Sequence, residues 1–395
     1  MQILFLSSVY PTPAEPTRGV FCYNLLRAIP AGSDVRVIAP WPWHRRLRHA
    51  LGGGSARSSG GEALWPTFFY PPGLLKGTHG RLMRASAGGA LRRVLASGFR
   101  PDCVLTYWTY PDGDAALRTA RRLGVPVALI VGGSDVLLLA GQSPRVRRLY
   151  IDVLRSVDEV QTVSEDLRAR VIALGVDPGR VHLSHQGVDS SLFCPGDAGE
   201  ARERLGLPAG RATLLWVGRM VPVKALDVLL ASMARLDRAG AGAPHLVLVG
   251  DGPLRRSLEA QAAGLGLADR VTFAGPRPQP ELPDWYRACD LVVLPSHSEG
   301  IPNVLREAHA CGRPFVATRV GGVAELADPA TSRLVEPGDP GALAEAIRAT
   351  LDDPPDPSAF APGSRSGSWE SSARRLVERL EAVVEVHRLG GPNRA

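Results

Sequence analysis

The sequence predicts an α/β protein built from two similar, doubly wound domains. Short apolar runs typical of buried strands alternate with segments typical of amphipathic helices, which is the pattern of parallel sheets covered by helices. This alternation pauses near residue 186 and restarts near residue 213. A length of 395 residues also allows two or three domains. In folds of this class, ligands bind beyond the carboxyl ends of the strands.

The first domain is expected to span residues 1–190. Its first strand, at 2–7, is followed by a loop that ends at Gly19 and by a helix over 20–29. The segment 41–80 is rich in proline, glycine and arginine and is predicted to be irregular. The other strands are expected at 34–39, 102–106, 126–131, 159–163 and 181–183, with helices over 81–97, 113–123, 145–157 and 164–174.

The second domain is expected to span residues 191–368, after a linker at 186–202. Its strands are expected at 213–217, 245–250, 271–274, 291–294, 314–317 and 332–335. The helices between and after them are expected over 225–236, 253–265 and 280–288, from Pro302 onward, and over 340–351. Residues 354–368 are rich in proline, serine and glycine, and a last amphipathic helix is expected over 369–387.

Cysteine and histidine usage gives no sign of a metal site or a disulfide framework. The five cysteines are far apart and odd in number, which is typical of reduced cytosolic thiols. The nine histidines show no paired metal-binding spacing. No apolar run reaches the roughly 18 residues of a membrane-spanning helix, and the N-terminus lacks the basic region of a signal peptide. We therefore expect a cytoplasmic protein without a metal.

Positive charge is concentrated in the first domain. Residues 1–190 hold 23 Lys and Arg against 14 Asp and Glu, whereas residues 191–395 hold 23 against 25. The ten basic residues of segment 41–100 face a single acidic one and are interleaved with aromatic residues. This composition is typical of contact with an anionic membrane surface, and no nucleic-acid-binding motif accompanies it. A solvated, arginine-rich face is the alternative interpretation.

The stretch 291–312 predicts a strand, a turn and a helix that together form an anion site. Pro302 suits the first helical position, where its missing N–H costs no hydrogen bond. The free N–H groups of Asn303 and Val304 would then point out of a helix N-terminus, where the helix dipole favours an anion.

Two carboxylates bracket this helix start, Glu299 in the turn and Glu307 in the helix. Carboxylates accept hydrogen bonds from hydroxyls. A ligand with hydroxyls at both ends and phosphates in the middle, such as a nucleotide sugar, therefore fits the stretch. The alternative is that Glu307 is an ordinary solvated helix residue.

Other strand ends of the second domain carry residues suited to the same ligand. Glycines permit close approach of the backbone, and arginine and lysine can bind a pyrophosphate. These features are Gly218 with Arg219 and Lys224, the turn at Gly250, Pro276 with Arg277, and the pair Gly321 and Gly322.

These segments resemble glycosyltransferase family 4, retaining transferases of the GT-B fold. The likeness rests on GRMVPVKALDVLL, on LVLVGDGPLRRSLE, and on the run from VTFAGPRPQP to VGGVAEL with its two spaced glutamates. YWTYPDGDAA, GGSDV and GVDSSLF in the first half most resemble the branch of teichuronic-acid and exopolysaccharide transferases. The resemblance implies two Rossmann-like domains facing a central cleft, with segment 369–395 crossing back onto the first, acceptor-binding domain.

The resemblance also implies a role for each candidate residue. Arg219 and Lys224 would neutralise the donor diphosphate, and Glu299 would hold the hydroxyls of the transferred sugar. The other donor contacts would be Glu307 on the ribose, Pro276 and Arg277 near the base, the backbone of Gly300, Ile301, Pro302, Asn303 and Val304 on the phosphates, and close approach at Gly19, Gly218 and Gly250. The resemblance implies no metal and no cofactor. The leaving phosphate oxygen can take the proton of the acceptor, so no dedicated base is needed.

Two positions depart from the family pattern. Many relatives have a histidine in the loop that reads VGGSD here, and Asp135 is expected to take over its contact with the sugar or the acceptor. Ala225 follows Lys224 where a glycine is usual, a change that a helix start should tolerate. The pair Asp112 and Asp114 imitates a metal-binding sequence but is predicted to be a turn with a helix N-cap.

The sequence therefore predicts a metal-independent, retaining glycosyltransferase. It would move a sugar from a nucleotide-diphosphate donor to a carbohydrate or lipid-linked acceptor in polysaccharide or cell-envelope glycan biosynthesis. The basic first domain is expected to face the acceptor and an anionic membrane, at the inner face of the plasma membrane, and no nucleic acid. Two alternatives stay open: a nucleotide-sugar epimerase of the same fold, and a non-catalytic subunit that binds a nucleotide sugar.

Overall fold

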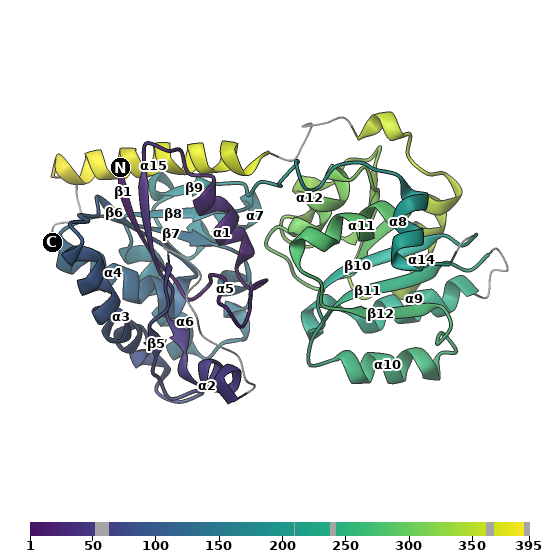
Figure 1. The fold of residues 1–395 in the computed structure, drawn as a ribbon, viewed down its shortest axis with the longest axis horizontal. Helices are drawn as coiled ribbons and strands as arrows, with labels where there is room; N and C mark the ends of the chain where they lie inside the picture. Colours follow the sequence, from purple (N-terminus) through teal and green to yellow (C-terminus); the bar gives the residue numbers. More distant parts are fainter. Residues whose placement is uncertain (52–62, 209, 238–241, 361–366, 391–395) are drawn as a thin grey trace. The chain divides into compact units, whose positions relative to one another are not determined.

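A computed structural model describes residues 1–51, 63–208, 210–237, 242–360 and 367–390. The chain forms two compact units. Unit 1 comprises residues 1–187 and the segment that begins at Trp369, and unit 2 comprises residues 188–368. Each unit is built on a parallel sheet with helices on its faces, which confirms the predicted α/β class (Figure 1).

Unit 1 is built on a seven-stranded sheet in the order β4-β2-β1-β6-β7-β8-β9, in which every pair is parallel. The interior strands are almost wholly buried, because helices cover both faces of the sheet. Two short strands, β3 and β5, pair separately. The strands are β1 (Gln2–Leu6), β2 (Asp34–Ile38), β3 (Trp41–Pro42), β4 (Ala63–Leu64), β5 (Thr67–Phe68), β6 (Cys103–Tyr107), β7 (Val127–Val131), β8 (Glu159–Thr162) and β9 (Val181–Leu183).

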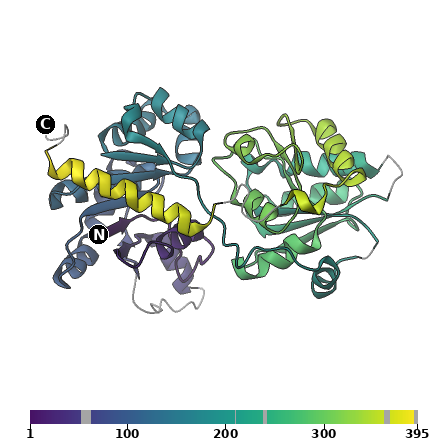
Figure 2. The same cartoon turned by 90° about the horizontal axis from the view of Figure 1, so that it is seen from above.

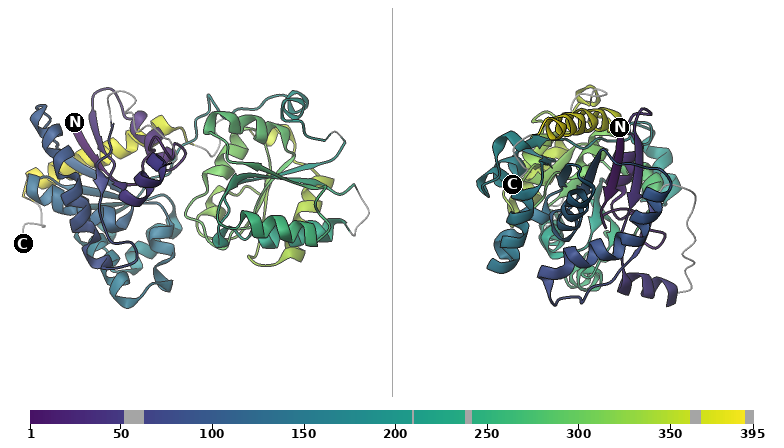
Figure 3. Two further views of the ribbon diagram at one scale, coloured as in Figure 1. Left: turned by 60° about the horizontal axis from the view of Figure 1, so that its bottom comes forward. Right: turned by 90° about the vertical axis from the view of Figure 1, so that its left-hand side faces the viewer.

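The helices of unit 1 form two layers. Helices α3, α4 and α6 pack together on one face of the sheet, and α1 packs against α15 on the other (Figure 3). They are α1 (Val20–Arg27), α2 (Trp43–Leu51), η1 (Lys76–Thr78), α3 (His79–Ala96), η2 (Thr109–Gly113), α4 (Asp114–Leu123), α5 (Ser134–Leu137), η3 (Leu139–Gly141), α6 (Pro144–Ser156), α7 (Glu165–Ala173), η4 (Pro178–Arg180) and α15 (Trp369–Arg388).

The last helix, α15, is tied to unit 1 by polar contacts along its length. Arg379 contacts the buried Glu159 of β8 at 2.8 Å. Nearer the start of the helix, the Ser372 hydroxyl donates to the backbone carbonyl of His185 at 2.7 Å. Figure 2 shows α15 running along this unit as the long yellow helix. These contacts explain why the segment from Trp369 groups with the first 187 residues.

Unit 2 is built on a six-stranded parallel sheet in the order β12-β11-β10-β13-β14-β15. Helix α9 packs against α10 and α14, whereas α11 packs against α8 and α12. The strands are β10 (Thr213–Arg219), β11 (His245–Asp251), β12 (Val271–Gly275), β13 (Leu291–Leu294), β14 (Phe315–Thr318) and β15 (Ser332–Val335). The helices are α8 (Ala198–Leu205), η5 (Pro222–Lys224), α9 (Leu226–Asp237), α10 (Arg255–Gly264), η6 (Gln279–Glu281), α11 (Leu282–Ala288), α12 (Asn303–Ala310), α13 (Val323–Leu326), α14 (Pro340–Asp352) and η7 (Pro357–Ala359).

Two segments are more regular than predicted. The segment 41–80 contains α2 and the strands β3, β4 and β5, and Arg46 of α2 donates to the carbonyl of Trp65 at 2.8 Å. This contact between distant residues supports α2, within a segment whose local composition indicates a loop. The predicted linker contains the start of α8, where the Asp197 side chain accepts from the Glu200 N–H at 2.8 Å. That capping pattern is visible in the sequence and was missed.

None of the helices in the described parts of the chain is long and apolar enough to cross a membrane.

Candidate functional site

The carboxyl ends of β10 and β13 bring two polar loops of unit 2 together. The His297 N–H donates to the carbonyl of Val223 at 2.8 Å, which joins the loop after β13 to the loop after β10. Across this junction, Lys224 Nζ lies 2.6 Å from Glu299 Oε1. The Ser296 hydroxyl donates to the same oxygen at 2.6 Å. Two residues predicted for one site are therefore in direct contact, in the loops that follow two adjacent parallel strands.

The start of α12 lies at the same edge of the sheet. We call this edge the rim: it comprises the loops after β10 and β13 and the first residues of α12. Pro302 is in an extended conformation and precedes the first helical residue, Asn303, so it is one position earlier than predicted. The first N–H groups of a helix have no partner within it, and they remain available for an anion. The Asn303 side-chain oxygen is buried and has no hydrogen-bond partner among the residues that the structure describes. Buried acceptors usually have a hydrogen-bond partner, so a ligand bound at this helix start can supply the missing donor.

Arg219 is the last residue of β10 and is exposed. Its guanidinium makes no ion pair with any residue in the part of the chain that the structure describes. The rim thus holds one cation that contacts a carboxylate, Lys224, and one that does not, Arg219.

Two glycines allow the backbone of this rim to pack closely. Gly250 has φ +139°, and a Cβ atom on it would lie 1.8 Å from the carbonyl oxygen of Gly218. Gly321 has φ +49°, and its Cβ atom would lie 1.9 Å from the carbonyl oxygen of Glu299. Any larger side chain would push the strand ends apart. Both glycines position the rim, whatever they contribute to ligand binding.

Glu307 is buried in α12 and is not the solvated helix residue of the alternative interpretation. The Tyr286 hydroxyl of α11 donates to its Oε2 at 2.7 Å. Burial raises the pKa of Glu307 to about 7, although hydrogen bonds from Tyr286 and Gln279 act in the opposite direction. Sequence reasoning missed Tyr286 and Gln279, because no local pattern indicates that α11 lies against α12.

Arg277 lies beyond the end of β12 with Pro276 beside it. Its guanidinium donates to the Ala274 carbonyl at 3.1 Å and lies 5.6 Å from the ring centre of Trp285. Glu281 lies 3.6 Å from the same guanidinium. These contacts hold Arg277 at the strand end where a base is predicted to bind.

Unit 1 has a pocket of its own, of about 390 Å³, beyond the ends of β1 and β6. Gly19 lines it with φ +70°, and a Cβ atom there would lie 2.7 Å from the backbone of Val9. Trp108, which follows β6, lines it with φ 86°, a conformation rare for a bulky residue. Tyr70 adds a second aromatic wall, and Asp112 adds a buried carboxylate. Strained backbone in a pocket is typical of binding sites.

Asp112 anchors the turn after β6. It accepts hydrogen bonds from the Ser7 hydroxyl at 3.0 Å and from the Ser8 N–H. Burial raises its pKa to about 6, against the effect of those hydrogen bonds. No side chain caps the following helix, so the predicted N-cap is wrong. Asp114 contacts Arg118 at 2.8 Å instead, and within the described residues no three His, Cys, Asp or Glu side chains form a metal-binding group.

Asp135 is also buried. Its carboxylate accepts from the Thr109 hydroxyl at 3.0 Å and from the Gly133 N–H at 2.9 Å. Burial raises its pKa, against the effect of these hydrogen bonds. Asp135 thus fixes its loop to the turn after β6, and its contact with a sugar or an acceptor stays a prediction.

Comparison with known protein families matches both halves of the chain. The family described as Glycosyltransferase Family 4 matches residues 19–192, and the family described as Glycosyl transferases group 1 matches residues 211–353. A D-inositol 3-phosphate glycosyltransferase of Thermomonospora curvata is 40% identical over 299 residues, 69% of each chain. The TuaC protein of Bacillus subtilis, which its name assigns to teichuronic acid biosynthesis as a glycosyltransferase, is 31% identical over 360 residues, 88% of each chain.

Solved structures share the fold over nearly the whole chain. The Anabaena protein HepE, in complex with UDP and glucose, superposes with a TM-score of 0.74 at 20% identity and covers 97% of this chain and 100% of its own. A sucrose-phosphate synthase of Thermosynechococcus elongatus superposes with a TM-score of 0.75 at 23% identity and covers 98% of both chains. These likenesses confirm the predicted two-domain GT-B fold.

Proposed function

This chain belongs to glycosyltransferase family 4, and we propose that it transfers a sugar from a nucleotide-diphosphate donor with retention of configuration. The acceptor is a carbohydrate or a lipid-linked carbohydrate, in polysaccharide or cell-envelope glycan biosynthesis. The reaction needs no metal and no cofactor besides the donor. The rim of unit 2 binds the donor, and the pocket of unit 1 binds the acceptor.

The contact between Lys224 and Glu299 carries this proposal. A diphosphate is a stronger partner for Lys224 than one carboxylate, and the unpaired Arg219 can bind the same phosphates in bidentate fashion. When Lys224 turns to the diphosphate, the Glu299 carboxylate becomes free to accept hydrogen bonds from sugar hydroxyls. The contact between Lys224 and Glu299 thus keeps both groups in place and keeps a buried carboxylate paired.

The chemistry follows from the charges at this rim. The bond between the anomeric carbon and the diphosphate oxygen breaks, and a bond from the same carbon to the acceptor oxygen forms on the same face. The acceptor proton passes to the leaving diphosphate oxygen, so no dedicated base is needed. Lys224, Arg219 and the dipole of α12 stabilise the negative charge that develops on the diphosphate.

Glu307 is placed to hold the ribose. Hydrogen bonds from Tyr286 and Gln279 fix its carboxyl group, and a carboxylate oxygen can accept a further hydrogen bond from a sugar hydroxyl. Pro276 and Arg277 follow the end of β12, where the base would be held. UDP is the first nucleotide to test, because the Anabaena structure of the same fold contains it.

The pocket of unit 1 suits an acceptor sugar. Aromatic walls such as Tyr70 and Trp108 pack on the apolar faces of sugar rings, and Asp112 offers a carboxylate to hydroxyls. Asp135 supports this pocket, because its hydrogen bond with Thr109 fixes the turn after β6.

Replacement of Lys224 tests the proposal. In Lys224→Ala we expect transfer to fall by roughly 100-fold or more, as for loss of a group that stabilises transition-state charge, while the fold is retained. Arg256→Ala, which removes one exposed cation from α10, is the matched control and should keep its activity. Turnover of Lys224→Ala near that of the unmodified protein would overturn the assignment.

The assay should offer UDP, GDP and ADP sugars and identify the products. A new glycosidic bond with the anomeric configuration of the donor supports retaining transfer, whereas an isomerised donor indicates an epimerase. Nucleotide-sugar binding without any product indicates a non-catalytic subunit. Activity that persists with a chelator supports the metal-independent part of the proposal.

We also propose that unit 1 contacts an anionic membrane from the cytoplasmic side. Liposome binding should then need anionic lipid and weaken as salt screens the charges. Equal binding to neutral vesicles would contradict this part.

A further inference from the structure

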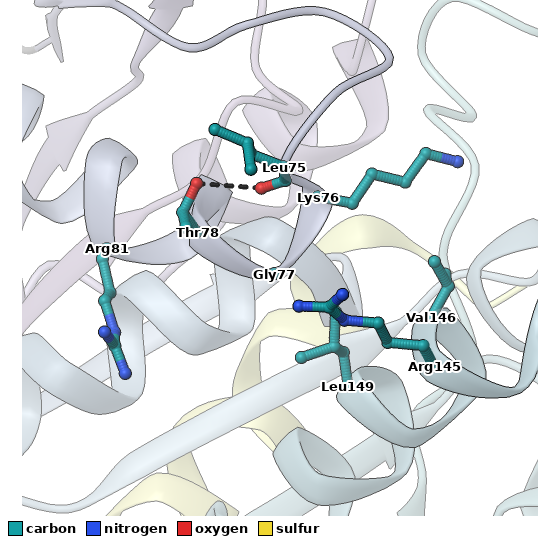
Figure 4. A pocket seen from close by; sticks show the side chains of 8 residues that line it. All are labelled: Leu75, Lys76, Gly77, Thr78, Arg81, Arg145, Val146 and Leu149. Carbon is teal, nitrogen blue, oxygen red and sulfur yellow. Dashed lines mark hydrogen bonds between the residues drawn. The ribbon is translucent and has the colours of Figure 1, made fainter.

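A second pocket in unit 1, of about 440 Å³, is not used by the proposed sugar transfer. It lies between η1, the start of α3 and the start of α6 (Figure 4). Figure 4 shows Arg145 extending over Leu149 toward the turn at Gly77, with Arg81 on the other side of that turn. The pocket is lined by Leu75, Lys76, Gly77, Thr78, Arg81, Arg145, Val146 and Leu149.

The pocket is positively charged without internal compensation. The side chains of Lys76, Arg81 and Arg145 make no ion pair or hydrogen bond with any residue whose placement the structure gives. No carboxylate lines the pocket. The segments that form it, residues 63–101 and 136–151, contain no aspartate or glutamate at all. Three cations with no counter-charge favour an anionic ligand.

The same pocket has an apolar floor and an apolar mouth. Val146 and Leu149 form its floor from α6. At its mouth, Leu75 is 71% exposed and the neighbouring Leu74 is 68% exposed. Exposed leucines beside cations are typical of surfaces that meet lipid.

Hydrogen bonds hold these leucines in the exposed position. The backbone carbonyl of Leu74 contacts His79 Nε2 at 2.8 Å, and the carbonyl of Leu75 accepts from the Thr78 hydroxyl at 2.8 Å. The Lys76 carbonyl accepts from the buried hydroxyl of Tyr110. Leu75 adopts φ 48°, a left-handed conformation that is costly for a branched side chain. A strained backbone whose carbonyls are all bound indicates that the exposed leucine has a role.

We propose that this pocket binds the phosphate of a lipid-linked acceptor, with the hydrocarbon chain along Leu74 and Leu75. This inference rests on the proposed sugar transfer and specifies the acceptor as a lipid phosphate that carries the sugar to be extended. Arg145 binds the phosphate at the turn of Gly77, and Lys76 and Arg81, whose side chains extend to either side of that turn (Figure 4), turn toward it. Val146 and Leu149 contact the first carbons of the chain.

The acceptor, rather than the bulk membrane, is favoured because the two pockets of unit 1 share a wall. His79 lines the pocket of the proposed acceptor sugar, and its neighbour Thr78 lines the phosphate pocket. Tyr110 connects the same elements, since its hydroxyl binds the Lys76 carbonyl and the next residue, Pro111, lines the sugar pocket. One molecule with a sugar next to a phosphate can therefore occupy both pockets across the first turn of α3.

Binding of small probes to the full chain tests the proposal. Farnesyl phosphate should bind, inorganic phosphate should bind more weakly, and farnesol should bind least, because only the first has both the charge and the chain. In the double variant Arg81→Ser and Arg145→Ser, binding of farnesyl phosphate should fall by about tenfold or more. The matched control is Arg92→Ser with Arg93→Ser, which removes the same charge from α3, roughly 17 Å along the helix from Arg81.

Equal loss in both double variants, or none in either, would overturn the pocket. A third variant, Leu75→Asn, removes the apolar mouth with a residue that tolerates the left-handed conformation. It should weaken farnesyl phosphate severalfold and leave inorganic phosphate unchanged. Equal weakening of both probes would overturn the lipid part of the inference.

Vesicles distinguish the acceptor from the bulk membrane. With phosphatidylcholine vesicles that carry phosphatidylglycerol, the pocket variant and its control should bind alike, because general charge attraction does not need the pocket. Weaker vesicle binding by the pocket variant alone, with farnesyl phosphate binding unchanged, would assign the pocket to membrane phospholipid and overturn the acceptor assignment.

Nucleotide binding separates this inference from the proposed function. The Arg81 and Arg145 variant should bind UDP, or whichever nucleotide the donor screen identifies, as the unmodified protein does. Lys224→Ala should lose nucleotide affinity and keep that for farnesyl phosphate. If nucleotide binding behaves as expected but farnesyl phosphate does not bind through Arg81 and Arg145, only the pocket inference is overturned.

Discussion

The rim of unit 2 and the pockets of unit 1 are built in different ways. The rim consists of backbone turns and short charged loops that directly follow strands, such as Lys224 after β10 and Glu299 after β13. The pockets of unit 1 draw side chains from segment 41–80, from the turn after β6 and from α6. The carboxyl ends of parallel strands lie along one edge of the sheet, so the residues of the rim can be predicted from the sequence. The pockets depend on contacts between distant segments and cannot be predicted in this way.

The largest effect should come from a single methyl group in the rim. Gly250→Ala places a Cβ atom 1.8 Å from the Gly218 oxygen, and we expect a loss of about 3 kcal/mol or more in the stability of unit 2. Gly266→Ala is the control, since Gly266 also has positive φ, 72°, but nothing lies within 4 Å of its Cβ position. It should cost only about 1 kcal/mol.

Hydrogen exchange followed by mass spectrometry reads each unit separately. Gly250→Ala should increase exchange in β10 and β11 far more than Gly266→Ala does. Equal exchange in the two variants would show that close backbone approach does not define the rim.

The ion pair between Arg379 of α15 and Glu159 of β8 should contribute to the stability of unit 1. Arg379→Ala leaves Glu159, which is 2% exposed in its side chain, without its cation, and we expect a loss of about 2 to 3 kcal/mol because an unpaired buried charge is costly. Arg388→Ala removes an exposed contact with Asp102 from the same helix and should cost less than about 1 kcal/mol. Hydrogen exchange of β8 gives the readout, and similar effects of the two variants would contradict the expectation.

The pH dependence of stability should separate the buried Glu307 from an exposed glutamate. Its pKa is raised from 4.5 in the unfolded chain to about 7 by burial. The folded protein therefore keeps a proton that the unfolded chain releases, and stability falls as pH rises from 4.5 to about 7, with the whole penalty present above that pH. Glu307→Gln lacks this penalty, so its advantage over the unmodified protein should grow by on the order of 2 kcal/mol between about pH 5 and 8.

Urea unfolding at the two pH values measures this difference. Glu345→Gln, on the exposed side of α14, is the control and should follow the unmodified protein. Parallel pH profiles of Glu307→Gln and the unmodified protein would show that the Glu307 carboxyl does not retain its proton in the fold.

The smallest effect should be a gain. Ala225 adopts φ 48°, a left-handed conformation and not that of an ordinary helix start. Ala225→Gly should relieve the left-handed strain and stabilise unit 2 by up to about 1 kcal/mol, since part of the gain is offset by the lost methyl contact. Ala201→Gly, in the interior of α8, should destabilise instead. Urea unfolding measures both, and a loss of stability in Ala225→Gly would contradict the strain.

Much of the fold was predictable because it rests on local patterns. The strands at 181–183, 291–294 and 332–335 have the predicted bounds, and most other elements differ by one or two residues at an end. Helix α2 was missed, because the contact of Arg46 with Trp65 that supports it joins residues 19 positions apart. Leu75 could not be identified as an exposed, strained residue, since its conformation depends on Tyr110 and His79.

The sequence by itself determined the family, the two parallel sheets and the charged residues at the strand ends. These follow from periodicity and from short motifs, in which neighbouring residues share one local geometry. Only the tertiary structure decided which partner each charged group has: Lys224 with Glu299, Tyr286 with Glu307, and Asp112 with Ser7. Within the described parts of the chain, it also left the side chains of Arg81 and Arg145 without an ion pair or hydrogen bond. Pairing depends on which segments the fold brings together, and no local pattern encodes that.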